Sequence, residues 1–400
     1  MPKSSIQTET ANVTTQAEVD ALCADCRKAG RFAFDTEFVM EDRFEPEACL
    51  LQLGAGNQVW IIDPLLGLDL QQVWQLVGHR DVEVIVHAGQ EDLALAVQHT
   101  GQLPRNIFDV QIAAGFVGHD YPISLQKLIQ STLRIRLHKS KTLTDWRKRP
   151  LTLAQLQYAA EDVIYLHEVY RILRGKLEKL GRMEWVREEC SKFEQPTLYE
   201  RTEEDKLMRL KGTRSLSGPQ LAIVQALLKW REGLAERFNR PARVLLKDHL
   251  LVEIARHQIA QFSEIRNLRG VNLKDTDVRA LAKVVAAAMQ TPVSEQPRPK
   301  PRERETPQEE VLAALITSVV RSYCLENRLS YSLVATQRSI RELIRHRASS
   351  NSNKSGSIQL LSGWRGESVG IMVDEVLSGL RSVRVEPTAE GLAVHVTPTA

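Results

Sequence analysis

In the first half of the chain, segments with the hydrophobic pattern of strands alternate with segments that have the pattern of helices. Short apolar runs predict strands, whereas apolar residues spaced three and four positions apart predict helices. The predicted strands are 31–39, 49–54, 58–62, 82–86 and 106–110, and the predicted helices are 68–77, 91–100, 112–117, 124–133 and 153–180, the last being one or two helices. This alternation predicts an α/β domain, which we assign to residues 1–200.

The second half of the chain has helical periodicity almost throughout. A charged stretch at 200–211 is expected to connect the two halves, and a helical module is expected at 210–290. Four prolines among charged residues within 291–306, followed by Pro307, predict an extended linker at 291–307. Residues 308–400 are expected to form a further helical region, although the tail at 382–396 alternates like a strand.

Four acidic residues and one tyrosine, in three short segments, are the candidate catalytic groups. Asp35 and Glu37 are two positions apart in a predicted strand, so their side chains are expected on one face. Tyr158 and Asp162 are four positions apart in a predicted helix, so they are expected one turn apart on one face. Asp92 opens a predicted helix, where the helix dipole favours an ionised carboxylate.

Clustered carboxylates repel one another and are costly to bury, so a fold that gathers four of them usually binds divalent cations. Oxygen ligands favour Mg²⁺ or Mn²⁺ over zinc, and such a site suits two-metal hydrolysis of a phosphodiester. Each segment alone has a simpler interpretation. Glu91 and Asp92 are as well explained by helix capping, and Tyr158 with Asp162 by an ordinary helix surface pair. The order, spacing and placement of all three segments together favour the catalytic interpretation.

The three segments resemble the motifs of the DEDD exonucleases that carry a tyrosine, and among these the ribonuclease D family. Asp-Thr-Glu-Phe-Val at 35–39, His-Ala-Gly-x-Glu-Asp-Leu at 87–93 and Tyr-Ala-Ala-x-Asp-Val at 158–163 are all intact. The resemblance implies a ribonuclease-H-like fold and hydrolysis from the 3′ end that releases nucleoside monophosphates. It assigns two divalent cations, Mg²⁺ or Mn²⁺, to Asp35, Glu37, Asp92 and Asp162, and the orientation of the attacking water to Tyr158.

Basic residues near the third segment are candidate contacts to nucleic acid. Residues 127–149 contain eight Lys or Arg and a single acid. Within this segment Lys139 and Lys141 are the preferred phosphate contacts. A solvated basic surface is an equally good interpretation of the individual residues.

The helical module resembles the helicase-and-RNase-D C-terminal (HRDC) domain over residues 221–256. This resemblance implies an auxiliary nucleic-acid-binding module, with Arg240, Arg243 and Lys247 as candidate phosphate contacts. Surface charges or helix caps explain these residues at least as well. Residues 308–400 resemble a second, degenerate HRDC-like module.

Composition changes this interpretation little. Hydrophobic content of 43% and charged content of 26% are ordinary for a globular protein, and the net charge of +3 does not by itself indicate nucleic acid. Five cysteines without a paired metal motif predict free thiols in a reducing compartment. The polar start of the chain and the lack of a long apolar run predict a cytoplasmic protein that does not enter membranes.

The sequence therefore predicts a metal-dependent 3′–5′ exoribonuclease that acts on structured RNA, with no obligate protein partner. A preference for tRNA precursors rests on the resemblance alone. One alternative is a DNA 3′–5′ exonuclease, because the same carboxylate cluster serves proofreading enzymes. The other is a non-catalytic RNA-binding scaffold that retains a metal site. Rates on matched RNA and DNA, and the effect of metal removal, distinguish the three.

Overall fold

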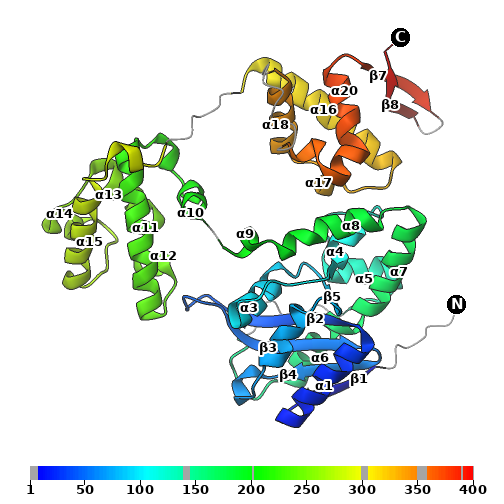
Figure 1. Ribbon diagram of the computed structural model, residues 1–400, viewed down its shortest axis with the longest axis horizontal. Coiled ribbons are helices and arrows are strands. Elements are labelled where there is room, and N and C mark those ends of the chain that lie inside the picture. The colour runs from blue at the N-terminus through cyan, green and yellow to red at the C-terminus, as the bar shows by residue number, and fades with distance from the viewer. Residues whose placement is uncertain are drawn as a thin grey trace.

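The computed structural model describes residues 8–137, 145–200, 202–298, 305–348, 358–388 and 391–399. Within these ranges the chain forms an α/β unit, a separate helical unit, and a C-terminal helical segment that ends in a hairpin (Figure 1).

A six-stranded mixed sheet forms the centre of the α/β unit. The strands, in sheet order, are β1 (Glu9–Val13), β4 (Gln58–Ile62), β3 (Glu47–Ala55), β2 (Arg31–Val39), β5 (Glu83–Val86) and β6 (Ile107–Asp109). β3 runs antiparallel to both of its neighbours, whereas β2, β5 and β6 run parallel to one another. The strand that carries two of the candidate acids therefore lies inside the sheet, between β3 and β5.

Helices cover both faces of this sheet. The helices of the unit are α1 (Gln16–Ala29), α2 (Gln71–Val77), α3 (Gln90–Thr100), α4 (Val110–Gly115), α5 (Leu125–Leu133), α6 (Leu153–Ile164), α7 (Leu166–Lys179), α8 (Met183–Cys190) and α9 (Pro196–Tyr199), with 3₁₀ turns at Pro64–Leu66 and Ser191–Glu194. Phe34 of β2 meets Trp74 of α2 edge to face, with ring centroids 6.2 Å apart. A Cβ at Gly54 of β3 would lie 3.6 Å from the carbonyl oxygen of Val163, so α6 covers the opposite face.

Two parts of the chain differ from the sequence expectation. Residues 9–13 form the edge strand β1, which pairs with β4 in parallel. Its first four residues are exposed, so the strand lacks the hydrophobic pattern that would have predicted it. The charged stretch expected to be a connection forms helix α10 (Glu203–Arg209). A capping box between Thr202 and Asp205 starts this helix, and Leu207 joins the core of the helical unit.

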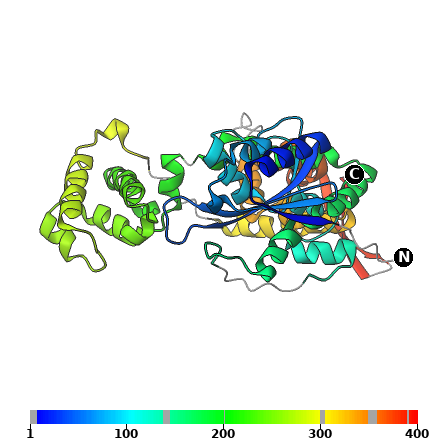
Figure 2. The same cartoon turned by 90° about the horizontal axis from the view of Figure 1, so that it is seen from below.

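The helical unit has a hydrophobic core of its own. After α10 come α11 (Gly218–Phe238), α12 (Ala242–Leu245), α13 (Asp248–His257), α14 (Phe262–Asn267) and α15 (Asp275–Ala288), with 3₁₀ turns at Thr213–Ser215 and Val293–Glu295. Its buried residues run from Leu207 to Ala288 and form a cluster separate from that of the α/β unit. Figures 1 and 2 both place α11–α15 at one end of the molecule, away from the sheet.

The C-terminal segment, in contrast, shares the core of the α/β unit. It comprises α16 (Pro307–Glu326), α17 (Tyr331–Val334), α18 (Gln337–Ala348), α19 (Gly363–Arg365), α20 (Ile371–Leu377), a 3₁₀ turn at Gln359–Leu361, a π-helical turn at Gly366–Gly370, and the antiparallel hairpin of β7 (Arg381–Thr388) and β8 (Gly391–Pro398). Buried residues from Ala313 to Val373 belong to the same cluster as the sheet. The expected strand-like tail is thus a hairpin, and it packs against α16 through a hydrogen bond from the Ser322 hydroxyl to the Val394 carbonyl.

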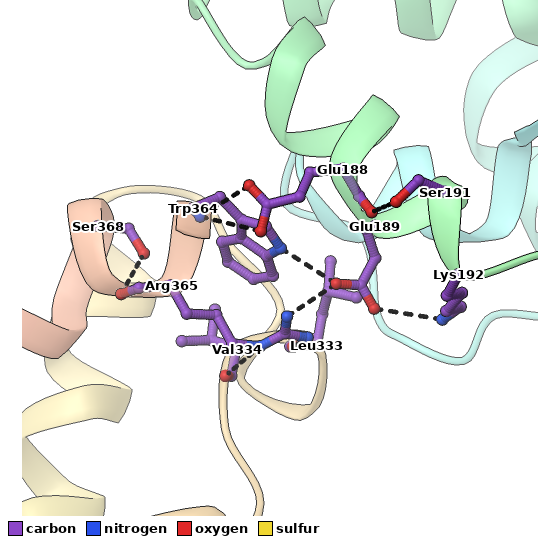
Figure 3. A network of polar contacts seen from close by, with 9 residues as sticks. All are labelled: Glu188, Glu189, Ser191, Lys192, Leu333, Val334, Trp364, Arg365 and Ser368. Carbon is purple, nitrogen blue, oxygen red and sulfur yellow. Dashed lines mark hydrogen bonds and ion pairs between the residues drawn. The ribbon is translucent and has the colours of Figure 1, made fainter. Parts of the chain in front are cut away.

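A partly buried ion pair fixes this segment against α8 (Figure 3). Glu189 Oε2 accepts hydrogen bonds from the Trp364 indole at 3.0 Å and from the Arg365 guanidinium at 2.8 Å. Arg365 also donates to the carbonyl oxygens of Leu333 and Val334. Because the guanidinium bonds to three acceptors at once, the partly buried charge pair is well compensated and sets one orientation for the segment.

All five cysteines are buried free thiols, as expected from the sequence. Of the helices in the described ranges, none combines the length and the apolar character that a membrane span requires.

Candidate active site

Three of the predicted acids meet between β2 and α6. Asp35 and Glu37 alternate with buried residues along β2, so their side chains lie on the face that α6 covers. Asp162 lies in the last turn and a half of α6 and faces the same layer. One carboxylate oxygen from each of Asp35, Glu37 and Asp162 lies within 4.8 Å of the other two.

Helix α6 holds Tyr158 next to this cluster. The helix begins with a capping box in which Thr152 and Gln155 bond to each other's backbone N–H groups. Tyr158 follows one turn later and donates a hydrogen bond to the Asp162 carboxylate. The Tyr158 ring lies against the buried ring of Trp146, with centroids 6.1 Å apart. The phenol is therefore fixed at the edge of the cluster from both sides.

Asp92 reaches the site from α3 and is tied to β2. Its Oδ1 accepts hydrogen bonds from the backbone N–H of Thr36 at 3.0 Å and from the Thr36 hydroxyl at 2.5 Å. Thr36 lies between Asp35 and Glu37, so this contact anchors the start of α3 beside the other two acids. Asp92 lies outside the group of three whose oxygens converge within 4.8 Å. Its negative charge nevertheless raises the pKa of both Asp35 and Glu37.

A second buried carboxylate shapes the loop that leads to Asp92. Asp109, at the end of β6, accepts hydrogen bonds from the N–H groups of Ala88 at 3.1 Å and Gln111 at 2.8 Å. Ala88 has a left-handed φ of 55°. A Cβ on Gly89 would come within 2.6 Å of Val86 Cβ, so this turn accepts only glycine at that position. Asp109 and Gly89 thus determine where α3 begins.

Burial and mutual repulsion disfavour the charged form of the four carboxylates unless cations neutralise them. Burial, followed by the nearby carboxylates, raises the pKa of Glu37 to about 8 and keeps that of Asp35 well above its usual range. Burial also raises the pKa of Asp162 to about 7 and of Asp92 to about 6, although hydrogen bonds from Tyr158 and Thr36 partly offset these shifts. A site made of oxygen ligands with such excess negative charge fits hard divalent cations.

Comparisons with known proteins identify the family. Residues 10–178 match the 3′–5′ exonuclease family model, and residues 220–284 match the HRDC domain. Ribonuclease D of Acidiphilium cryptum is 32% identical over 385 residues, which cover 94% of this chain and 95% of that protein. The chain belongs to the ribonuclease D family.

Further ribonuclease D proteins agree with this assignment. Ribonuclease D of Bartonella henselae is 29% identical over 376 residues, which cover 92% of this chain and 90% of that protein. The crystal structure of Escherichia coli RNase D, described as an exoribonuclease involved in structured RNA processing, has a TM-score of 0.79 at 27% identity. The structural match covers 93% of this chain and 99% of the Escherichia coli chain.

The expected α/β exonuclease domain followed by an HRDC helical region is confirmed. The protein is a 3′–5′ exoribonuclease with an exonuclease fold that depends on divalent metal ions.

The basic residues predicted near α6 are only partly described. Lys139 and Lys141 lie outside the described residues. Arg147 pairs with Asp42 at 2.7 Å, and Arg149 makes a bidentate pair with Asp63 and donates to the Cys49 carbonyl. These two arginines therefore brace the segment before α6 through neighbouring acids.

The candidate phosphate contacts of the helical unit lie on its surface. Arg240 and Lys247 are exposed, Lys247 at the N-cap of α13. Arg243 is also exposed, with its guanidinium 2.9 Å from Asp248. All three lie between the end of α11 and the start of α13, and we refer to these three residues as the basic patch.

Sequence reasoning gave no role to Thr36 or Asp109. The spacing gave no signal for Thr36, because a residue between two candidate ligands on a strand faces the opposite side. Asp109 lies at the end of a predicted strand, and only the fold shows its carboxylate capping the loop before α3. For Thr36 the available signal was its place inside the acidic motif itself, and for Asp109 it was a polar residue at the end of an apolar strand.

Replacing Thr36 with valine is expected to slow RNA hydrolysis about tenfold with little loss of stability. The substitution removes the hydroxyl that donates to Asp92 and keeps the side-chain shape, and loss of such a supporting contact costs about 10- to 100-fold in metal affinity or activity. Steady-state rates and thermal unfolding of Thr36→Val and Thr36→Ser test this. The serine variant keeps the hydroxyl and should stay near wild type; equal losses in both variants would refute the role of the hydroxyl.

Proposed function

We propose that the chain removes nucleotides one at a time from RNA 3′ ends and releases nucleoside 5′-monophosphates. The carboxylate cluster between β2, α3 and α6 is the main support for this proposal. Oxygens of three acids lie within 4.8 Å of one another, and the fourth acid, Asp92, is hydrogen-bonded to Thr36 of β2. The proposed metal ligands are Asp35, Glu37, Asp92 and Asp162, and the ions are two Mg²⁺ or Mn²⁺.

Divalent ions at such a site lower the pKa of a water and neutralise charge on the leaving 3′ oxygen. The protein's part is to hold the ligands in place. β2 presents Asp35 and Glu37 from a rigid strand, and the Thr36 contact fixes Asp92 relative to them. Buried sites of this kind strengthen electrostatic stabilisation because water is excluded.

Tyr158 is proposed to orient the attacking water. A free tyrosine ionises near pH 10, so a phenol is a poor general base at neutral pH. The hydroxyl of Tyr158 already bonds to Asp162, and the ring is held by Trp146, so it is a fixed hydrogen-bonding group beside the ligands. Its contribution is positioning rather than proton removal.

Replacing Tyr158 with phenylalanine is expected to lower kcat by about 100-fold even at saturating Mn²⁺, where any weaker metal binding through Asp162 no longer limits the rate. The substitution removes one hydroxyl and keeps the ring against Trp146. Single-turnover rates and Mn²⁺ titration by calorimetry separate the two effects. A variant with wild-type turnover on several RNAs would remove Tyr158 from the mechanism.

The proposed substrates are structured RNAs with a free 3′ end, with tRNA precursors first among them. The support is the family, together with the description of the Escherichia coli protein as acting in structured RNA processing. In this proposal the basic patch of Arg240, Arg243 and Lys247 binds RNA phosphates at a distance from the chemistry.

A tRNA precursor with a 3′ trailer tests the substrate and the product together. We expect stepwise trailer removal with nucleoside 5′-monophosphates as products, resolved by chromatography. Arg240→Ala with Lys247→Ala should weaken binding and lower its salt dependence without changing the rate at saturation. Release of oligonucleotides or of nucleoside 3′-monophosphates would contradict the proposed reaction, and equal rates on unstructured RNA would contradict the substrate preference.

A further inference from the structure

Gln52 is an unexplained polar residue in the core strand beside the active site. It lies in β3 within the run Ala48–Leu53, where every other residue is hydrophobic and buried. The residue itself is 0% exposed. Neither its amide nitrogen nor its amide oxygen has a hydrogen-bond partner. An unpaired buried amide costs about 1–3 kcal/mol per group, so a leucine here would give a more stable sheet.

The register of the sheet places Gln52 against the metal-site acids. β2 and β3 are antiparallel, and Gln52 lies directly opposite Asp35. Side chains of residues directly opposite each other share a face, with Cβ atoms about 4.5–5.5 Å apart. Gly54, two positions along β3, faces Val163 of α6, so Gln52 faces the same layer between the sheet and that helix. The amide is therefore within side-chain reach of the Asp35 carboxylate.

Asp35 lacks the support that its neighbours have. Asp92 receives two hydrogen bonds from Thr36, and Asp162 receives one from Tyr158. Among the described residues no side chain donates a hydrogen bond to the Asp35 carboxylate, which has only a backbone hydrogen bond from Thr36. Carboxylates that ligate metals are normally held by a further hydrogen-bond donor.

We propose that Gln52 is a positioning residue for the metal site: its amide nitrogen donates a hydrogen bond to the Asp35 carboxylate when that carboxylate ligates a divalent cation. This inference rests on the metal site proposed above. It accounts for an amide at an otherwise apolar position, because the unpaired donor gains a partner when Asp35 ligates an ion. The contact sets the orientation of Asp35 toward the ions.

Gln52→Met in the full-length protein tests the proposal, with two readouts. Methionine fills nearly the same space without a donor, so the metal-free variant should unfold at a temperature equal to or above that of the wild type. Its Mn²⁺ affinity, measured by calorimetry, should fall about 10- to 100-fold. Leu53→Met is the matched control, because Leu53 is buried in the same strand and faces the opposite side. The control should bind Mn²⁺ as the wild type does.

The possible outcomes separate the two proposals. A Gln52→Met protein that unfolds at a lower temperature yet binds Mn²⁺ like the wild type would overturn the positioning role and leave a packing role. Wild-type protein that takes up no Mn²⁺ would instead refute the metal site itself. If Gln52→Met fails to fold, Gln52→Leu also removes the amide donor and places an apolar side chain in the buried strand. The same loss of Mn²⁺ affinity is then expected, and unchanged affinity overturns the proposal.

Discussion

Replacing Asp162 with asparagine is expected to lower the rate of RNA hydrolysis by about a thousandfold, the upper end of what loss of one electrostatic contact at a reacting centre costs. The amide keeps the size of the side chain and an acceptor for Tyr158, so the fold should be unaffected. The substitution removes the charge of one of the three carboxylates whose oxygens lie within 4.8 Å of one another. An amide oxygen is a weaker ligand for a hard cation than a carboxylate.

Glu161→Gln is the matched control for Asp162→Asn. It makes the same chemical change one position earlier in α6, at a residue that bonds to Gln157 on the helix surface. Initial rates on a short labelled RNA at saturating Mg²⁺ should show little change for the control. If Asp162→Asn hydrolyses RNA as fast as Glu161→Gln does, then Asp162 is not a ligand.

The Tm of the metal-free protein is expected to fall by at least about 5 °C as the pH rises from 6.5 to 8. The folded-state pKa values of Glu37, about 8, and Asp162, about 7, lie above their unfolded values. The folded state therefore binds more protons than the unfolded state in this range, and its stability must fall as those protons leave. Mn²⁺ should restore Tm most strongly near pH 8, where the carboxylates are charged.

The pH window isolates the acids from the histidines. Burial lowers the pKa of His87 and His167, so below about pH 6.5 they favour unfolding and act with the opposite sign. As the pH rises above 6.5 their opposing contribution fades, because the unfolded state then loses its histidine protons as well. Calorimetric unfolding of wild type and Asp162→Asn in EDTA tests the account, since the variant should have a higher Tm near pH 8 and a shallower slope. Identical slopes would show that the carboxylate cluster does not produce the effect.

Local periodicity was sufficient for most of the α/β unit. The strand predicted at 31–39 is β2 with the same bounds, and the helix predicted at 91–100 begins one residue earlier, at Gln90. Spacings of two on a strand and four on a helix also placed Asp35 with Glu37, and Tyr158 with Asp162, on common faces. These predictions succeeded because they depend only on backbone geometry.

Features that depend on tertiary contacts could not be predicted in this way. The exposed edge strand β1 is held by pairing with β4, which its own residues do not signal. Contacts such as Thr36 with Asp92, and Glu189 with Trp364, join residues 56 and 175 positions apart. The break between α6 and α7 at Tyr165 was likewise left open, because both sides have helical periodicity.

The most direct test of the central claim uses one 5′-labelled single strand, made as RNA and as DNA, with Mg²⁺ or Mn²⁺. Wild type and Asp35→Ala are compared on a sequencing gel, with and without EDTA. We predict a ladder that shortens from the 3′ end of the RNA, requires metal, and is absent in Asp35→Ala. A ladder that forms only on DNA, or one that persists in EDTA or in Asp35→Ala, would contradict a metal-dependent exoribonuclease centred on these carboxylates.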